Sequence, residues 1–115
     1  MAKLECKLWG SFDSILEDLH NTVLNGSFSA SYEDGGDYRL SGGARCAVRV
    51  YERYSYMGGN RVSLSLTLFG QDGHCTLCAV TSGGSQAVLF KFNTFGEEAF
   101  LDTIRATVEK YAVGN

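Results

Sequence analysis

Cys75 and Cys78 are the residues whose spacing most directly indicates chemistry. They form a CxxC pair in the segment His74-Cys75-Thr76-Leu77-Cys78, a pattern that binds zinc when a turn brings both thiolates together or acts as a redox pair at a helix N-terminus. In an extended strand, residues an odd number apart point to opposite faces. The sequence has no second CxxC or His pair to complete a tetrahedral set. We therefore expect ordinary thiols, with Cys75 inside and Cys78 outside, no metal and no cofactor.

The other polar groupings indicate turns rather than sites. The segment Ser82-Gly83-Gly84-Ser85 has backbone N–H groups for a phosphate, but it lacks the lysine and the following helix of a P-loop. The acidic residues of segment 33–37 lack the ligand spacing of a calcium loop. His20 and His74 have no serine or aspartate partner visible by spacing, so neither supports a nucleophilic triad. We expect a protein without catalytic residues.

Glu52 is expected at a position that is energetically unfavourable for a carboxylate. The strand pairing derived below puts it on the core face between Val50 and Tyr54, where a lone carboxylate is costly and its pKa is raised. Three interpretations stay open. A bulge turns Glu52 outward; it is paired inside with Tyr54, Tyr56 or another group; or Glu52, Tyr54 and Tyr56 orient a mostly apolar ligand between sheet and helix.

The opposite face of the expected sheet collects arginines, aromatic rings and apolar side chains. It is a solvated face, a protein interface or a nucleic-acid surface. The residues assigned to the interface are Arg49, Tyr51, Arg53, Phe69, Cys78, Val80 and Leu89. The balance of 10 Lys+Arg against 13 Asp+Glu gives a net charge of −3, which argues against nucleic acid. A second copy of the chain is the partner that this face indicates.

The composition is that of one globular domain over residues 1–115. Hydrophobic residues make up 44% and charged residues 20% of the chain, which are ordinary values for a folded protein. The 14 glycines, with no proline, indicate many tight turns. No apolar run approaches the ~20 residues that span a bilayer, and the first residues carry charges where a signal peptide is apolar. We expect a cytoplasmic protein without a membrane segment.

A strand and a helix open the chain. Leu4, Cys6 and Leu8 alternate with charged residues, which indicates a half-buried strand. Apolar residues at helical spacing predict a helix over 12–25, with Ser11 as N-cap and Gly26 in the left-handed position after its end. Short strands are expected on either side of a turn at 34–37, followed by a long strand over 45–57.

Three glycine turns predict an antiparallel meander over about 45–92. The turns are Gly58-Gly59-Asn60, Asp72-Gly73 and Gly83-Gly84, and the second is a strong hairpin signal. The resulting cross-strand partners are Val50 with Leu68, Leu68 with Leu77, and Leu77 with Phe90. With this pairing the three hairpins place their paired apolar residues on one face, which also carries Cys46 and Val48, as a sheet register requires.

The last segment predicts a helix. Thr94-Phe95-Gly96-Glu97 has the form of a capping box. The apolar stripe that follows consists of Phe100, Leu101, Ile104, Val108 and Tyr111. This stripe must cover the inner face of the sheet. The expected fold is α+β: a strand, a helix, an antiparallel meander of five or six strands, and a C-terminal helix packed on one face of a curved sheet.

This order of elements resembles the helix-grip or TBP-like architecture, in which a curved antiparallel sheet wraps a long C-terminal helix. A smaller variant, strand–helix–four strands–helix, applies if segment 28–41 is irregular. Segments 81–87 and 90–98 also look like a family of small uncharacterised proteins from Gram-positive bacteria, a resemblance that implies no activity. Helix-grip proteins often hold apolar ligands between sheet and helix. The expected function is therefore binding of a small apolar or amphipathic ligand there, and the alternative is an interaction module or homodimer using the outer sheet face.

Overall fold

The fold is a five-stranded antiparallel sheet with helices on one side. The computed structural model describes residues 1–54, 60–83 and 90–113. Its elements are β1 (Ala2–Trp9), α1 (Phe12–Asn25), β2 (Ser31–Arg39), β3 (Arg45–Tyr54), β4 (Arg61–Gln71), β5 (His74–Gly83), α2 (Phe90–Asp102) and α3 (Arg105–Tyr111). The strands lie in the order β1-β5-β4-β3-β2, and every neighbouring pair is antiparallel. The expected α+β class is confirmed, with four strands between the first helix and the C-terminal helices.

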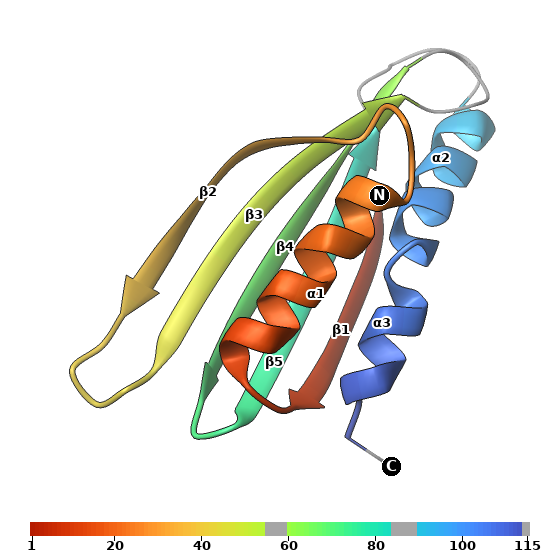
Figure 1. The fold of residues 1–115 in the computed structure, drawn as a ribbon. Coiled ribbons are helices and arrows are strands. Elements are labelled where there is room, and N and C mark those ends of the chain that lie inside the picture. Colours follow the sequence, from red (N-terminus) through yellow and green to blue (C-terminus); the bar gives the residue numbers. More distant parts are fainter. Residues whose placement is uncertain (55–59, 84–89, 114–115) are drawn as a thin grey trace.

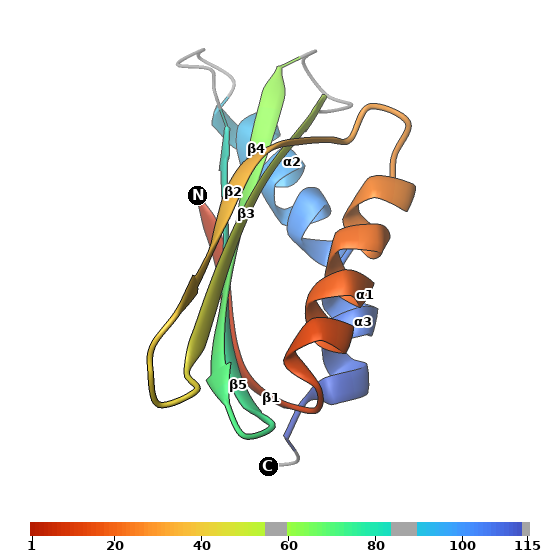
Figure 2. The same cartoon turned by 60° about the vertical axis from the view of Figure 1, so that its left-hand side comes forward.

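The molecule has two layers. All three helices lie on one face of the curved sheet, the inner face, whereas no helix among the described residues covers the outer face (Figures 1 and 2). The core lies between the layers, where side chains of β4 and β5 such as Leu66 and Leu77 pack with Leu101 and Ile104 of the C-terminal helices. Each fully buried aliphatic side chain contributes about 1.5–3 kcal/mol. The apolar stripe predicted for the last helix therefore helps to hold the two layers together, as do the buried Ile15, Leu19 and Val23 of α1.

The hairpin between β4 and β5 forms as predicted. Asp72 and Gly73 have φ values of +55° and +82°, which is the pair of left-handed residues that a tight two-residue hairpin turn requires. Leu68 lies opposite Leu77. Cys75 is buried on the inner face and Cys78 lies on the outer face, which confirms that this CxxC pair cannot converge on one ion.

The predicted pairing of the long strand is wrong by three residues. Tyr54 pairs with Arg61, so Val50 lies opposite Ser65 rather than Leu68. Because side chains alternate along a strand, an odd shift moves every side chain of β3 to the other face. Ala47 and Tyr51 are therefore buried on the inner face, and the side chains expected inside, including Cys46, point outward.

The predicted third hairpin does not form. Phe90, expected in a strand opposite Leu77, begins helix α2, and the turn at Gly83-Gly84 falls partly on residues 84–89, outside the described part of the chain. β5 instead pairs along its second edge with β1, so that Cys6 lies opposite Leu77. A strand from the start of the chain thus occupies the place that sequence order gives to the next strand.

The C-terminal helical segment begins earlier than predicted and is broken. It starts at Phe90 rather than after Thr94, and α2 ends at Asp102. The Thr103 and Ile104 amides donate to carbonyls three residues back, at 3.2 Å each, a tighter winding that ends one helix before the next begins. Among the described residues, none of the helices is both long and apolar enough to cross a membrane.

The segment before β3 is one strand, not two. The turn expected at 34–37 lies inside β2, which contains a bulge between Tyr32 and Asp34. A Cβ atom at Gly35 would lie 2.3 Å from the Val48 carbonyl oxygen and 2.5 Å from the Tyr32 hydroxyl. The glycine therefore lets the tyrosine ring lie close against the strand.

Helix α1 has the predicted bounds. Ser11 caps it by accepting a hydrogen bond from the Ser14 amide at 3.3 Å. Gly26 was predicted in the left-handed region and is not: its φ of −81° is right-handed. The helix therefore ends with a continued right-handed turn, and no positive φ is needed there.

Candidate functional site

Of the three residues predicted to hold a ligand, the two that the structure describes do not lie between the sheet and the helices. Glu52 is on the outer face, where its carboxylate accepts a 2.7 Å hydrogen bond from Arg61 Nε. Tyr54 is about half-exposed on the same face, and Tyr56 lies outside the described residues. Of the three interpretations of Glu52, the two that keep it inside are therefore wrong, and its outward position needs no bulge in β3. It faces outward because the whole strand is paired in another register.

The predicted interface divides between the two faces. Phe69, Cys78 and Val80 lie on the outer face as expected, and Leu89 lies outside the described residues. Arg49, Tyr51 and Arg53 face the helices instead, which corrects their assignment. Tyr51 is fully buried, and the Arg53 guanidinium lies 4.6 Å from the centre of the Phe100 ring in the core. The register of β3 accounts for all three errors.

The centre of the outer face carries no charge. Three adjacent rows run across β3, β4 and β5, as the strand pairing shows. We call these nine positions the outer band: Cys46, Phe69 and Thr76; Val48, Thr67 and Cys78; Val50, Ser65 and Val80. Charged side chains occur at its borders, with Lys3, Glu5 and Lys7 on β1 and Asp34 on β2.

One end of the outer band opens into an apolar hollow. Tyr38, Leu40 and Phe69 are all more than half exposed there. With Arg39, Ala44, Arg45 and Cys46 they line a space of about 300 Å³. Exposed apolar side chains that gather in this way mark a surface suited to binding another molecule.

A second hollow, the α1 groove, lies on the inner face where β2 extends beyond the helices. Its lining residues are Asp13, Leu16, Glu17, His20 and Arg49, around a space of about 400 Å³. His20 Nδ1 lies 2.7 Å from the hydroxyl of Tyr51. Burial raises the pKa of Tyr51 far above its usual value, and the positive charge of Arg49 only partly opposes this. The phenol therefore keeps its proton and holds the imidazole ring in place.

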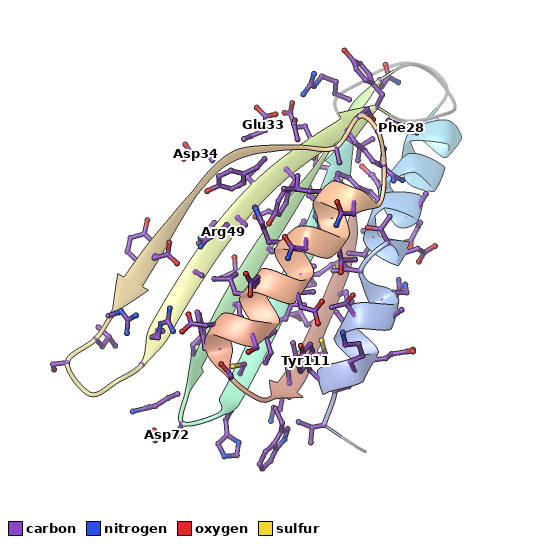
Figure 3. The ribbon with its side chains drawn as sticks, in the orientation of Figure 1. Phe28, Glu33, Asp34, Arg49, Asp72 and Tyr111 are labelled. Carbon is purple, nitrogen blue, oxygen red and sulfur yellow. The ribbon has the colours of Figure 1, made fainter. Side chains whose placement is uncertain are left out.

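Arg49 forms a rigid wall of the α1 groove. Its guanidinium donates to the carbonyls of Gly36 and Val48 at 3.2 and 2.9 Å, and to both carboxylate oxygens of Asp37 at 3.1 and 3.2 Å. Figure 3 shows Arg49 on β3 reaching toward β2. Both bonds to Asp37 come from Nη2, and the two bonds to the carbonyls come from Nη1. Together they fix the guanidinium, and the carboxylate balances its charge.

Aromatic rings pack around His20, one of the residues that line the α1 groove. His20 meets the Tyr32 ring edge to face, with centroids 5.5 Å apart, and the Tyr51 ring lies 5.7 Å from that of Tyr32. Tyr32 remains almost half exposed. The groove itself is lined by an imidazole, an arginine and two carboxylates, and the accessible Tyr32 ring lies next to the imidazole, groups that bind and orient a small molecule. Over the described ranges, no three His, Cys, Asp or Glu side chains are grouped to hold a metal ion.

Sequence reasoning missed the α1 groove because its residues come from distant segments. His20 and Tyr51 are 31 positions apart, and no spacing rule links a helix to a strand at that separation. Asp37 was taken for a turn residue. The one signal in the sequence was the alternation of side chains along β3. Arg49 and Tyr51 are two residues apart, so their side chains lie on the same face of the strand in either of its two orientations.

Comparison with known proteins identifies a family but no activity. No curated protein and no solved structure matches the chain. Residues 1–112 match the model of a family described as a family of unknown function, DUF6054. That match extends from β1 through α3, so the fold and both hollows lie within it, and the chain belongs to this family.

Proposed function

We propose that the chain is a non-catalytic interaction module that pairs with a second copy of itself through the outer face of its sheet. The observation that carries this proposal is the outer band, nine neighbouring positions without a charge on a face that the described helices leave open (Figure 2). A fifth of the chain is charged, so a purely solvated face should carry lysine or glutamate near its centre. Charged residues are instead depleted at the centres of protein interfaces.

The strand order makes this face self-complementary. β4 is the middle strand of the five. A two-fold axis along β4, between two copies face to face, stacks β5 on β3 of the second copy and β1 on its β2. Thr67 then meets Thr67, Cys78 lies level with Val48 of the second copy, and Val80 with Val50. Apolar side chains therefore lie against apolar side chains on both sides of the axis.

The charges at the borders favour the same axis. Lys3 lies in the row of Asp34, and Lys7 in the row of Tyr38, so the axis along β4 joins an ammonium to a carboxylate and another ammonium to an aromatic ring. An axis across the strands would instead stack Glu5 on Glu5 and Lys3 on Lys7. Like charges in contact oppose such an arrangement.

The size of the face is adequate for a stable pair. Five strands about 4.8 Å apart and eight residues at about 3.3 Å rise project to roughly 600 Å² per copy. The accessible area of side chains exceeds this flat projection. Specific interfaces bury roughly 800 Å² per partner, so most of the outer face has to be used.

The expected ligand site between sheet and C-terminal helix receives no support. Leu66, Leu77 and Ile104 fill that space with at most 1% of their surface exposed, and Glu52 and Tyr54 lie on the other side of the sheet. Self-association on the outer face is the alternative that the sequence already offered, and the geometry now favours it.

Sedimentation equilibrium from about 1 to about 200 µM tests the pairing directly, because mass action shifts a dimer with concentration. The wild-type chain should reach the mass of two copies. Lys3→Asp and Asp34→Lys should each weaken the dimer by about fivefold or more, and the double variant should regain most of that loss. Thr67→Glu puts two carboxylates on the axis and should give a monomer. Asn21→Glu, with the same change on the exposed surface of α1, is the matched control.

Three results would contradict the proposal. The first is a wild-type monomer at the highest concentration. The second is a dimer that Thr67→Glu leaves intact, and the third is a double charge-reversal variant in which the two losses add without rescue. The second and third results would each mean that the interface lies on another surface.

A further inference from the structure

We propose that the α1 groove binds a small organic cation, a primary amine carried on a short apolar or aromatic body. This site is independent of the interface proposed above, because the α1 groove lies on the inner face and shares no residue with the outer band. The inference rests on three observations: the charge balance of the groove, the exposed ring beside it, and the rigidity of its walls.

The charge balance leaves one carboxylate for a ligand. Asp13 is paired with Arg45 at 2.9 Å, and Asp37 is paired with Arg49. Glu17 lies one helical turn after Asp13 on the same side of α1 and lines the groove. Within the described part of the chain Glu17 has no ion pair. The groove therefore presents a net negative charge at Glu17, which an ammonium group would neutralise.

The Tyr32 ring, which lies beside the lining residue His20, suits the same kind of ligand. Tyr32 exposes almost half of its surface, and its ring is held near His20 by edge-to-face packing. An ammonium near a tyrosine ring is attracted by the negative face of the π-system. An apolar body would lie along Leu16, which is only partly buried and packs against the core. A cationic head and an apolar body thus each have a complementary surface.

The walls are fixed before any ligand arrives, which lowers the entropic cost of binding. Four hydrogen bonds hold the Arg49 guanidinium, and the buried Tyr51 hydroxyl holds Nδ1 of His20. When the phenol donates to Nδ1, the imidazole proton resides on Nε2. Nε2 is then the ring nitrogen left to serve the groove, as a donor for a polar group on the ligand.

Three probes of matched shape test the charge preference: phenethylamine, 2-phenylethanol and phenylacetate. The readout is the imidazole Hε1 and Cε1 resonances of His20, and His74 serves as an internal reference because it packs against Trp9 at the start of β5. Phenethylamine should shift the His20 signals saturably in the range of about 1–10 mM. The alcohol should bind several-fold more weakly and the anion should not bind, and the His74 signals should stay unchanged.

Two variants link the preference to Glu17. Glu17→Gln should weaken phenethylamine binding by about twofold to fivefold and leave 2-phenylethanol unaffected, because only the charge is removed. Glu109→Gln, on the exposed surface of α3, is the matched control and should bind the amine as the wild type does. Absence of saturable shifts up to about 20 mM amine, equal affinity for the amine and the alcohol, or an unchanged affinity in Glu17→Gln would each overturn the proposal. None of these outcomes bears on the dimer, so the two proposals fail separately.

Discussion

Replacing Tyr51 by phenylalanine should destabilise the protein at neutral pH and stabilise it at high pH. The Tyr51 side chain is fully buried, and its hydroxyl makes a 2.7 Å hydrogen bond to His20 Nδ1. Tyr51→Phe removes that bond without opening a cavity larger than one oxygen atom. A net loss of about 0.5–1.5 kcal/mol in the free energy of unfolding follows for a single hydrogen bond.

The sign of the effect reverses because of the proton on the phenol. Burial raises the pKa of Tyr51 in the folded state, whereas an unfolded tyrosine titrates near pH 10. The stability that the buried phenol contributes is therefore complete below pH ~10 and is lost as pH rises toward the folded-state pKa, because the unfolded chain ionises first. At pH ~11 this loss reaches about 1.4 kcal/mol for the wild type. The phenylalanine variant has no such loss.

The two stabilities should cross. The curves cross at the pH where the free energy lost with the hydrogen bond equals the free energy that the unfolded wild-type chain gains by ionising Tyr51. This condition puts the crossing between pH ~10.1 and ~11.1. Urea unfolding of both proteins from pH ~8 to ~11.5, under reducing conditions, measures it. Tyr38→Phe is the matched control, because Tyr38 is more than half exposed, and its stability difference from the wild type should stay small and roughly constant. A difference for Tyr51→Phe that does not change with pH would refute the burial of this hydroxyl.

Three further variants or reactions test other parts of the fold. Gly35→Ala should lower the free energy of unfolding by about 1–3 kcal/mol in urea, because the new methyl group meets the Val48 carbonyl oxygen. Gly42→Ala is the control and should be nearly neutral, because the nearest atom to its new methyl group is 3.9 Å away. Asp18→Asn should lower the melting temperature at pH 7 but not in acid. Hydrogen bonds from Lys110 and Tyr111 lower the pKa of Asp18 in the folded state. The stability that the Asp18 carboxylate contributes is therefore present above pH ~4 and is lost as pH falls through the folded-state pKa. Iodoacetamide should alkylate Cys75 last in the native protein, because Cys75 is buried whereas Cys6, Cys46 and Cys78 are partly exposed. Burial also raises the pKa of the Cys75 thiol, as it does for Cys6. Fast modification of Cys75 detected by peptide mass spectrometry would contradict its position.

Local turn chemistry explains which part of the sheet could be predicted. Asp72-Gly73 has a strong preference for one turn type, and that turn alone sets the register of β4 against β5. The same reasoning failed at Gly58-Gly59-Asn60, because Tyr54 pairs with Arg61, whereas a three-residue turn there would pair Met57 with Arg61. The pairing of β5 with β1 joins residues 65 to 79 positions apart, and no pattern within either segment predicts it.

The error on β3 has a physical cause that also bears on function. A strand normally reveals its buried face by its apolar residues, yet the outward side of β3 carries Cys46, Val48 and Val50, whereas the inward side carries Arg49 and Arg53. Reversing the strand would bury the more apolar set, so burial in the monomer alone does not account for this arrangement. If the outer band is covered by a second copy and the α1 groove is lined with polar groups for a ligand, both faces of β3 carry the residues that their surroundings require. The hydrophobic pattern that misled the sequence prediction is thus the pattern expected of a strand with two buried faces in the dimer, and a monomeric chain at high concentration would leave those three apolar residues without an explanation.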